Sequence, residues 1–413
     1  MKCGVGLVFV VLASLGCAQQ SLPRCTSMRV RPNAANLSPQ QWSAIANVMR
    51  RMNNDGWMSR FGASHDRLFS RVHGNTCFFP FHRRYVLEFE NIARGYDPNF
   101  VVPYWDATES FRTPATDKLL SATALGTNGE SSDHCVTNGI QSNTQVTYPD
   151  NHCLRRNFNN GNSIAPWYAP EIISSYIQAD TSLAQFREDI EYSIHGAVHL
   201  GLGGEMNTGY AAQDFSFMVH HANLDRLWWD WQNTHNSFLM YDGTGSSGPA
   251  SLRDSIPEDA AVPFNGASVE SVMVLGYGNV CYTYDSSVNP PQNYPGGGGN
   301  GGGSSNGAAV TSASPNASNR DRESQGILGS LSSDTIDRFF PGLSGGSRSR
   351  RRRGNDKPAP HTSNSGRYIP FPSQLTPEWI AMHGYDPTRV RAAHANACEL
   401  VTILNNSTYA SPY

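Results

Sequence analysis

Histidine is distributed unevenly along this chain, and this pattern constrains the fold more than any other feature of the sequence. Of the 13 histidines, three fall between residues 65 and 82 and four between residues 195 and 221. Neutral imidazole suits copper, zinc, iron and nickel, and a catalytic metal site takes three protein ligands and keeps one position open. The two clusters therefore predict a fold that gathers separate helices around bound metal.

The second cluster carries the more specific pattern. In IHGAVHL, His195 and His199 stand at positions i and i+4, which share one face of a helix. Gly196 occupies the position at which a zinc peptidase with an HExxH motif has glutamate, so that class is excluded. Of the adjacent pair His220 and His221, only one side chain should reach the ion, because successive helical side chains point about 100° apart.

Longer motifs surround both clusters. In chain order they are HGNTCFFPFHRRYVLEFE, PYWDAT, HGAVH with HHANLDRLWWDWQ, and YTY, at residues 73–90, 103–108, 195–232 and 282–284. The first and third resemble the CuA and CuB halves of the tyrosinase, catechol oxidase and molluscan haemocyanin family. The other two resemble its PYWDW segment and its closing Tyr-x-Tyr. The resemblance spans roughly residues 25–285.

The resemblance implies two copper ions, each held by three histidines. The residues on matching motif positions are His73, His82, His195, His199 and His221. The remaining CuA ligand lies upstream in relatives, after a variable loop. His65 is the only upstream histidine here and is assigned by elimination, the alternative being a histidine on a helix surface. His220 is interpreted as a packing residue, and Asp225 as the acceptor of the second N–H of His221.

The implied chemistry is the oxidation of small phenols by O2. Two Cu(I) ions together supply two electrons, and three imidazoles on each leave room for O2 and substrate. The resemblance implies Glu191 as a general base, with a solvent-facing helix acid as the alternative. Many relatives with strong monophenol activity have asparagine where this chain has Gly196. We therefore expect oxidation of o-diphenols to o-quinones first, with hydroxylation of monophenols as a second activity that the resemblance leaves open.

Other positions depart from the family pattern. Thr208 stands where some relatives have a bulky phenylalanine over CuA, which predicts an open mouth. Arg71 stands where some relatives have a cysteine linked to a ligand histidine, so no thioether is expected and Cys77 is assigned to a disulfide or to the core. The tryptophans at positions 228, 229 and 231 are interpreted as packing residues rather than as a substrate platform.

The hydrophobic pattern predicts a mainly α fold. Helices are expected over residues 38–54, 82–97, 186–204 and 214–235, from their apolar period, an N-cap serine followed by proline, and glycine stops. Strand signals are few and short. The resemblance implies that the helices form a four-helix-bundle dicopper core of the tyrosinase type.

Composition divides the chain into four parts. Residues 1–18 have the pattern of a secretory signal peptide, with an apolar stretch too short to span a bilayer. Residues 19–285 form the expected catalytic domain. Residues 286–366 are rich in Gly, Ser and Arg and are expected to be a flexible linker, with an apolar island at 327–343 that is a candidate docking segment. Residues 367–413 are expected to be a small helical appendage.

The remaining features bear on export and partners. Arg350–Arg353 is either a site for a processing protease or a solvated charge run. Six cysteines follow the signal peptide and suggest disulfides, of which Cys135–Cys153 is favoured because the pair flanks one polar loop. The net charge of −3 does not point to nucleic acid, and no later apolar stretch predicts a membrane span. Sequons for glycosylation occur at Asn36, Asn316, Asn405 and Asn406.

These observations favour a secreted, copper-dependent phenol oxidase that feeds melanin-type pigment or crosslinking. The alternatives are a haemocyanin-like oxygen carrier and a matrix protein with a relic site. Carriers repeat such units in tandem, whereas this chain contains one unit and a signal sequence, which favours the enzyme. Because C-terminal extensions in relatives often cover the site until they are cut off, latency is a further hypothesis.

Overall fold

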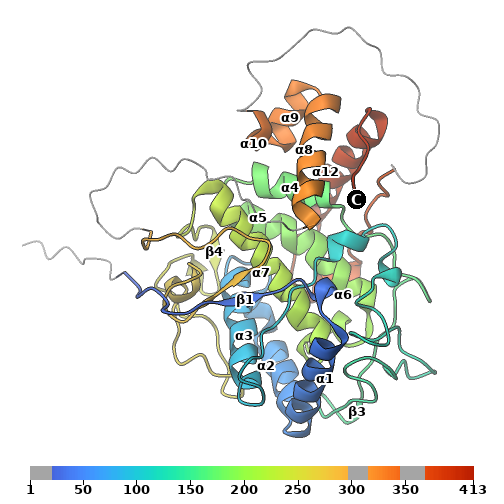
Figure 1. The fold of residues 1–413 in the computed structure, drawn as a ribbon, viewed down its shortest axis with the longest axis vertical. Helices are drawn as coiled ribbons and strands as arrows, with labels where there is room; N and C mark the ends of the chain where they lie inside the picture. Colours follow the sequence, from blue (N-terminus) through green and yellow to red (C-terminus); the bar gives the residue numbers. More distant parts are fainter. Residues whose placement is uncertain (1–20, 296–314, 345–367) are drawn as a thin grey trace, which may run out of the picture.

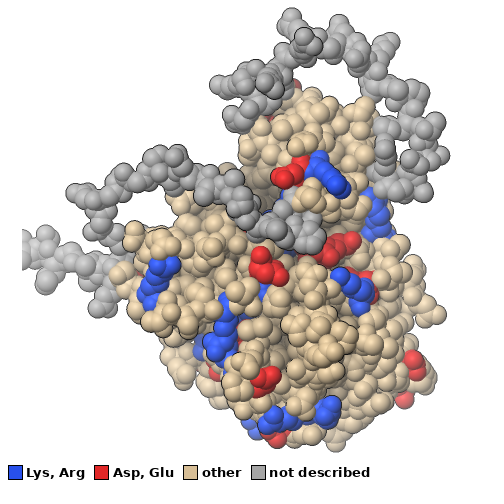
Figure 2. Space-filling model, in the orientation of Figure 1, with Lys and Arg blue, Asp and Glu red and all other residues tan. Residues whose placement is uncertain are grey.

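The computed structural model describes residues 21–295, 315–344 and 368–413 (Figure 1). The predicted signal peptide and the Arg350–Arg353 segment lie outside the described residues. On the face drawn in Figure 2, basic and acidic side chains are interspersed rather than gathered by sign. Within the described residues, no helix combines the length and the apolar character needed to cross a membrane.

Helices form the body of the first described segment. They are α1 (Pro39–Asn54), α2 (Trp57–Val72), α3 (Phe78–Ala93), α4 (Pro170–Ala179), α5 (Leu183–Ile190), α6 (Gly196–Leu202) and α7 (Phe215–His235). The predicted start of α1 is confirmed, because the Ser38 side chain accepts a hydrogen bond from the Gln41 backbone and the Gln41 side chain returns one to Ser38. The expected mainly α fold is thus observed.

Four of the predicted histidine ligands lie on α2, α3, α6 and α7, and α3 packs directly on α7 (Figure 1). A buried ion pair fixes this contact, since the Arg83 guanidinium of α3 donates to Asp225 of α7. Removing one partner of a buried pair is strongly destabilising because it leaves the other charge uncompensated. The helices that carry the histidine motifs are therefore held in register by charge as well as by apolar packing.

The two ends of the domain are tied together beside this bundle. Strand β1 (Arg29–Arg31) pairs in parallel with β6 (Tyr282–Tyr284), and a disulfide joins Cys25 to Cys281. The hydroxyls of Tyr282 and Tyr284 donate to one carboxylate oxygen of Asp225 at 2.6 and 2.5 Å. The Tyr-x-Tyr motif thus closes the domain by anchoring its last strand to α7.

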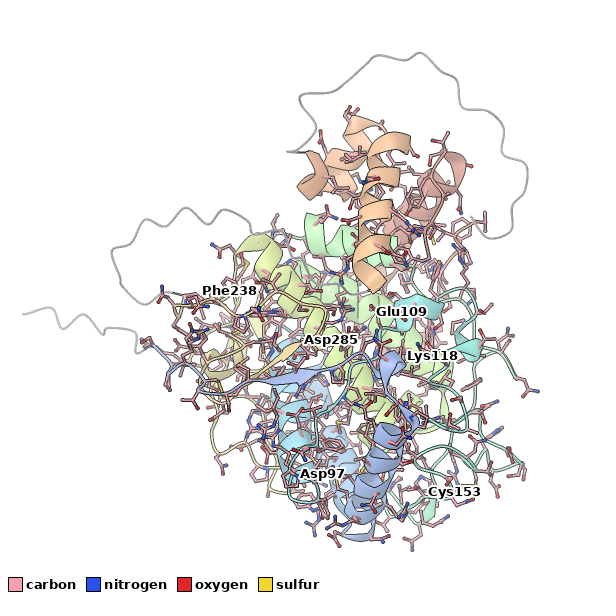
Figure 3. The ribbon with its side chains drawn as sticks, viewed as in Figure 1. Asp97, Glu109, Lys118, Cys153, Phe238 and Asp285 are labelled. Atoms are coloured by element: carbon pink, nitrogen blue, oxygen red, sulfur yellow. A yellow bond between two sulfur atoms is a disulfide. The ribbon has the colours of Figure 1, made fainter. Side chains whose placement is uncertain are left out.

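Short hairpins occupy the loops. Strand β2 (Gln145–Val146) pairs with β3 (His152–Cys153), and β4 (Thr244–Gly245) with β5 (Gly248–Pro249). The favoured disulfide Cys135–Cys153 is confirmed, and Cys153 lies in the loop layer at the edge of the molecule (Figure 3). Cys77 is buried with a free thiol, so of its two predicted roles the structure supports the core.

The predicted helix over residues 186–204 is interrupted. A π-helical turn, η4 (Glu191–His195), separates α5 from α6, with a non-helical backbone at Ser193 (φ −116°, ψ −106°). The glycine stop is confirmed, since α6 ends at Leu202 and is followed by Gly203, whose φ of +59° suits glycine. π turns within helices accompany functional sites, and the last residue of this one, His195, is the first histidine of the HxxxH motif.

The remaining helices come later in the chain. They are α8 (Pro315–Ser330), α9 (Ser333–Phe339), α10 (Pro341–Ser344), α11 (Pro377–Met382) and α12 (Pro387–Asn406). Among them, α9, α10 and α12 pack on α4, as the orange and red ribbons of Figure 1 show. The expectation of a flexible linker throughout 286–366 is therefore wrong for residues 315–344. The apolar island docks, because Ile336 and Phe340 bury their side chains where α9 and α10 contact α4.

Candidate metal centre

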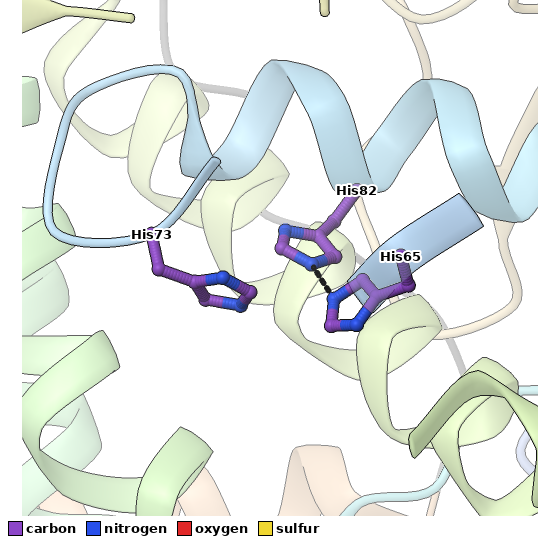
Figure 4. Close-up of side chains that lie close together, drawn as sticks. All are labelled: His65, His73 and His82. Atoms are coloured by element: carbon purple, nitrogen blue, oxygen red, sulfur yellow. Dashed lines mark hydrogen bonds between the residues drawn. The ribbon is translucent and has the colours of Figure 1, made fainter. Parts of the chain in front are cut away.

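The six predicted histidine ligands meet in two buried groups. The groups are His65, His73 and His82, and His195, His199 and His221; within each, the candidate ligand atoms lie within 4.8 Å of one another. Figure 4 shows the first group, with His65 on α2, His82 on α3 and His73 on the loop between them. His65 is only 1% exposed, which excludes its alternative role on a helix surface.

Backbone carbonyls orient these rings. In His73, His82 and His195, Nδ1 donates to the carbonyl four residues earlier, at 3.0, 2.7 and 3.4 Å. In His65 and His199, Nδ1 donates to the carbonyls of Gly209 and Met206, both at 2.6 Å. Fixing the proton on Nδ1 leaves the lone pair on Nε2, the nitrogen that is then available to a metal.

The spacing of the Nε2 atoms fits a cation. His65 Nε2 and His82 Nε2 are 3.4 Å apart, as are His199 Nε2 and His221 Nε2. In His65 and His82 the protons lie on Nδ1, so two lone pairs face each other and repel, whereas two nitrogens on one tetrahedral ion stand about 3.3 Å apart for metal–nitrogen bonds of about 2.0 Å. The imidazole donor set also suits copper. The residues present therefore fit two copper ions.

The two groups face each other across the bundle. The rings of His82 and His221 stack with centroids 4.1 Å apart, and those of His73 and His195 are 5.8 Å apart. Burial is the main cause that lowers the pKa of all six imidazoles, to about 4 for His65 and about 3 for His199. The rings are therefore neutral, which is the form that binds a metal.

Asp225 does not have the role expected from the sequence. Its carboxylate is taken by Arg83, Tyr282 and Tyr284. The Nδ1 atom of His221 has no hydrogen-bond partner among the described residues. The i+4 spacing placed Asp225 on the correct helix face, but the guanidinium and the two phenols compete better for a buried carboxylate. Asp225 is thus a structural residue of the bundle.

Glu191 is fully buried beside the first group, which excludes a solvent-facing role. One carboxylate oxygen accepts from the Gly74 backbone at 2.8 Å and from the Tyr385 hydroxyl at 2.7 Å, and the other accepts from Arg187 at 3.0 Å. Burial raises the pKa of Glu191, and Arg187 opposes that shift. A buried carboxylate adjoining a metal site is suited to proton transfer once one of its donors leaves.

Comparison with known proteins places these groups in a family. The sequence model of the common central domain of tyrosinase matches residues 39–234. The tyrosinase of Streptomyces galbus is 30% identical over 196 residues, which cover 43% of this chain and 70% of the relative. This chain belongs to the tyrosinase family. The family's coupled dicopper centre corresponds to the two histidine groups.

Other proteins of known family also resemble this chain. The tyrosinase of Streptomyces antibioticus is 28% identical, with 55% of this chain and 92% of that protein covered. A tyrosinase-like protein of Diaporthe leptostromiformis is also 28% identical, and the match spans 62% of its length. Among solved structures, a polyphenol oxidase variant from Thermothelomyces thermophila has the same fold, with a TM-score of 0.53, 19% identity, and 63% and 90% of the two chains covered.

The open mouth predicted for this tyrosinase-family site is not observed. The segment around α11 lies over it: the ring of Trp379 is 5.3 Å from that of His199, and the ring of His383 is 5.0 Å from that of His73. A Cβ on Gly196 would lie 2.5 Å from Leu375. The open mouth was expected from Thr208, which belongs to the catalytic domain. The C-terminal segment, residues 368–413, supplies a cover over the site that this expectation did not include.

Sequence reasoning missed the covering residues. His383 matched no family motif, and neither periodicity nor spacing links residues 375–385 to the histidine groups. The prediction for the tryptophans of α7 is confirmed, since Trp228, Trp229 and Trp231 are fully buried in the core.

Proposed function

We propose that this chain is a secreted phenol oxidase that uses two copper ions and O2 to oxidise o-diphenols to o-quinones, and that its C-terminal segment keeps it latent. The observation that carries the proposal is the pair of facing, buried histidine groups with Nε2 atoms 3.4 Å apart. When bound there, copper supplies the two-electron exchange with O2. Pigment formation or crosslinking is the role proposed for the quinones.

The protein's own groups orient the ions and handle protons. Carbonyls hold five of the six imidazoles with Nε2 turned inward. Glu191 is proposed as the acceptor of the substrate's phenolic proton. In the intact chain, the hydroxyl of Tyr385 occupies one of its oxygens. Removal of the C-terminal segment would therefore free both the mouth of the site and its base.

Export and processing belong to the same proposal. The apolar stretch within residues 1–18 supports a signal peptide, and the two disulfides are typical of an oxidising compartment. A cut at Arg350–Arg353 would separate residues 368–413 from the rest of the chain. The cut alone would leave them held by non-covalent contacts, such as the ion pair of Arg338 with Glu399 at 2.5 Å.

An oxygen carrier of the haemocyanin kind is the second candidate. The covering ring of Trp379 favours it, because a covered site admits O2 more readily than a phenol. The two functions differ in what happens when the cover is removed. A latent enzyme becomes active, whereas a carrier has no reaction of its own to uncover.

The experiment places a specific protease site within residues 345–367, removes the cleaved segment by size-exclusion chromatography, and compares intact and trimmed protein, each loaded with copper. Quinone absorbance is followed with a catechol and with a monophenol. We expect the trimmed form to oxidise the catechol at least about tenfold faster than the intact form, because the cover must otherwise open before substrate enters. The monophenol should react slowly or after a lag. No catechol oxidation by a trimmed form that holds two coppers would contradict the enzyme proposal.

A further inference from the structure

His383 stands at the end of the covering helix α11, against both histidine groups. Its ring is 5.0 Å from that of His73 in the first group and 6.1 Å from that of His195 in the second. Rings that belong to the same group are spaced similarly, for example 4.7 Å for His195 and His199 and 5.2 Å for His73 and His82. The ring of His383 therefore lies about as close to the candidate ligands as these lie to one another.

The ring is oriented by the same device as three of the ligands. Nδ1 of His383 donates to the carbonyl of Trp379, four residues earlier, at 2.9 Å, as in His73, His82 and His195. This fixes the lone pair on Nε2. That atom is buried and has no hydrogen-bond partner among the described residues. A buried, unpaired acceptor is costly, and a nearby cation would relieve that cost.

The placement of the ring is held from several sides. The ring of Trp379 packs against that of His383 with centroids 3.9 Å apart. The centroid of the Tyr385 ring lies 4.8 Å from that of His383. Tyr385 is in turn anchored to Glu191. His383 is only 5% exposed. The ring is therefore held beside both histidine groups by a packed cover.

We propose that His383 supplies a seventh imidazole nitrogen to the copper pair of the intact chain, at the exchangeable position that substrate would otherwise use. This inference rests on the proposed dicopper site. His383 belongs to neither three-histidine group, whose ligand atoms lie within 4.8 Å of one another. It is therefore an addition to the six ligands and not a replacement for one of them. The cover then acts as a ligand, not only as a bulky obstacle, and leaves when a competing ligand or the loss of the segment displaces it.

The test compares three forms of the intact chain, each loaded with oxidised copper. They are the wild type, His383→Phe and His383→Ala. His383→Phe keeps an aromatic ring but removes the nitrogen, whereas His383→Ala opens space as well. Azide binding is measured from its charge-transfer band, and the nitrogen coordination of copper from X-ray absorption. We expect both variants to bind azide at least about tenfold more tightly than wild type, because the internal ligand no longer competes. The nitrogen count should fall by about one per copper pair.

The outcomes separate the two proposals. If His383→Phe binds azide as weakly as wild type while His383→Ala binds it tightly, the cover acts by bulk and the seventh-ligand inference is overturned. If all three bind azide equally, it is overturned as well. Copper content is measured first, since a wild-type chain holding fewer than two coppers would refute the dicopper assignment itself. Thermal melting of each variant verifies that the C-terminal segment remains docked.

Discussion

The Tyr385 hydroxyl donates a hydrogen bond to Glu191 at 2.7 Å, and so joins the C-terminal segment to the π turn that ends at His195, the first histidine of the HxxxH motif. Both residues are buried. The bond places a tail residue on the carboxylate proposed as the base of the reaction. Cover and catalytic centre are thus connected by a charge-assisted hydrogen bond, a stronger class than the bond between two neutral groups.

Replacing Tyr385 by phenylalanine should loosen the cover. The change removes one donor to a buried carboxylate and keeps the ring, at an expected cost of about 2 kcal/mol. The intact Tyr385→Phe chain should therefore oxidise catechol faster than the intact wild type. Tyr368→Phe is the matched control, since Tyr368 lies in the same segment with its ring 54% exposed. Equal rates for the two intact variants would show that the bond does not hold the cover.

Replacing His65 by alanine tests the one ligand assigned by elimination. His65 provides one of three nitrogens in its group, so its loss should leave about one copper per chain instead of two. Metal analysis after dialysis measures this directly. His134→Asn is a suitable control, because His134 lies outside both groups and asparagine tolerates its φ of +55°. Full copper retention by His65→Ala would refute the assignment.

The metal centre was largely predictable from the sequence because its signals are local. His195 and His199 share a helix face whatever the tertiary fold, and the motifs around His82 and His221 are long. The helices that carry them were predicted for the same reason. The local patterns did not predict every detail of these helices. The turn at Ser193 interrupts the predicted helix, and Asp225 accepts hydrogen bonds from residues that are distant in sequence.

The resemblance suggested a C-terminal cover, but the residues that form it were not predictable, because they depend on contacts between distant residues, such as Tyr385 and Glu191, which are 194 positions apart. Nothing in the spacing of Trp379 or His383 indicates which surface they pack on. The helices of residues 315–344 were missed for a related reason. Their flanks are rich in Gly and Ser, and their order depends on burying Ile336 and Phe340 at α4, a surface that composition does not reveal.

Replacing Gly196 by asparagine should displace the cover from the other side. A Cβ at this position would lie 2.5 Å from a Leu375 methyl and 3.0 Å from Trp379 Nε1, and overpacking of this kind typically costs about 1–3 kcal/mol. Limited proteolysis of the intact chain should therefore cut residues 368–413 more rapidly in the variant. Gly329→Asn is the comparison, since a Cβ there meets nothing within 4 Å. If the rate of proteolysis in Gly196→Asn is unchanged, the cover accommodates the new side chain by a local shift and stays docked.

The far end of the C-terminal segment is held by two buried carboxylates. The Tyr413 hydroxyl donates to Glu323 of α8 at 2.7 Å, and the Tyr409 hydroxyl donates to Glu171 of α4 at 2.8 Å. Burial, and then the charge of Glu171, raises the pKa of Glu323 to about 7; Arg320 and the Tyr413 and Ser174 hydroxyls oppose this rise. Burial also raises the pKa of Glu171. Docking of the C-terminal segment therefore favours the protonated form of Glu323 and Glu171.

This arrangement predicts that the segment is held more tightly in acid. Glu323 binds its proton more strongly when docked, so its contribution is complete below its ordinary pKa of 4.5 and is lost as the pH rises through about 7. After cleavage within residues 345–367, size-exclusion chromatography should show the segment retained at pH 5 and released above pH 7. The difference in affinity should be about 100-fold. Glu323→Gln mimics the neutral carboxyl and should flatten this dependence; a variant that releases the segment with the same pH profile as wild type would assign the effect to other groups.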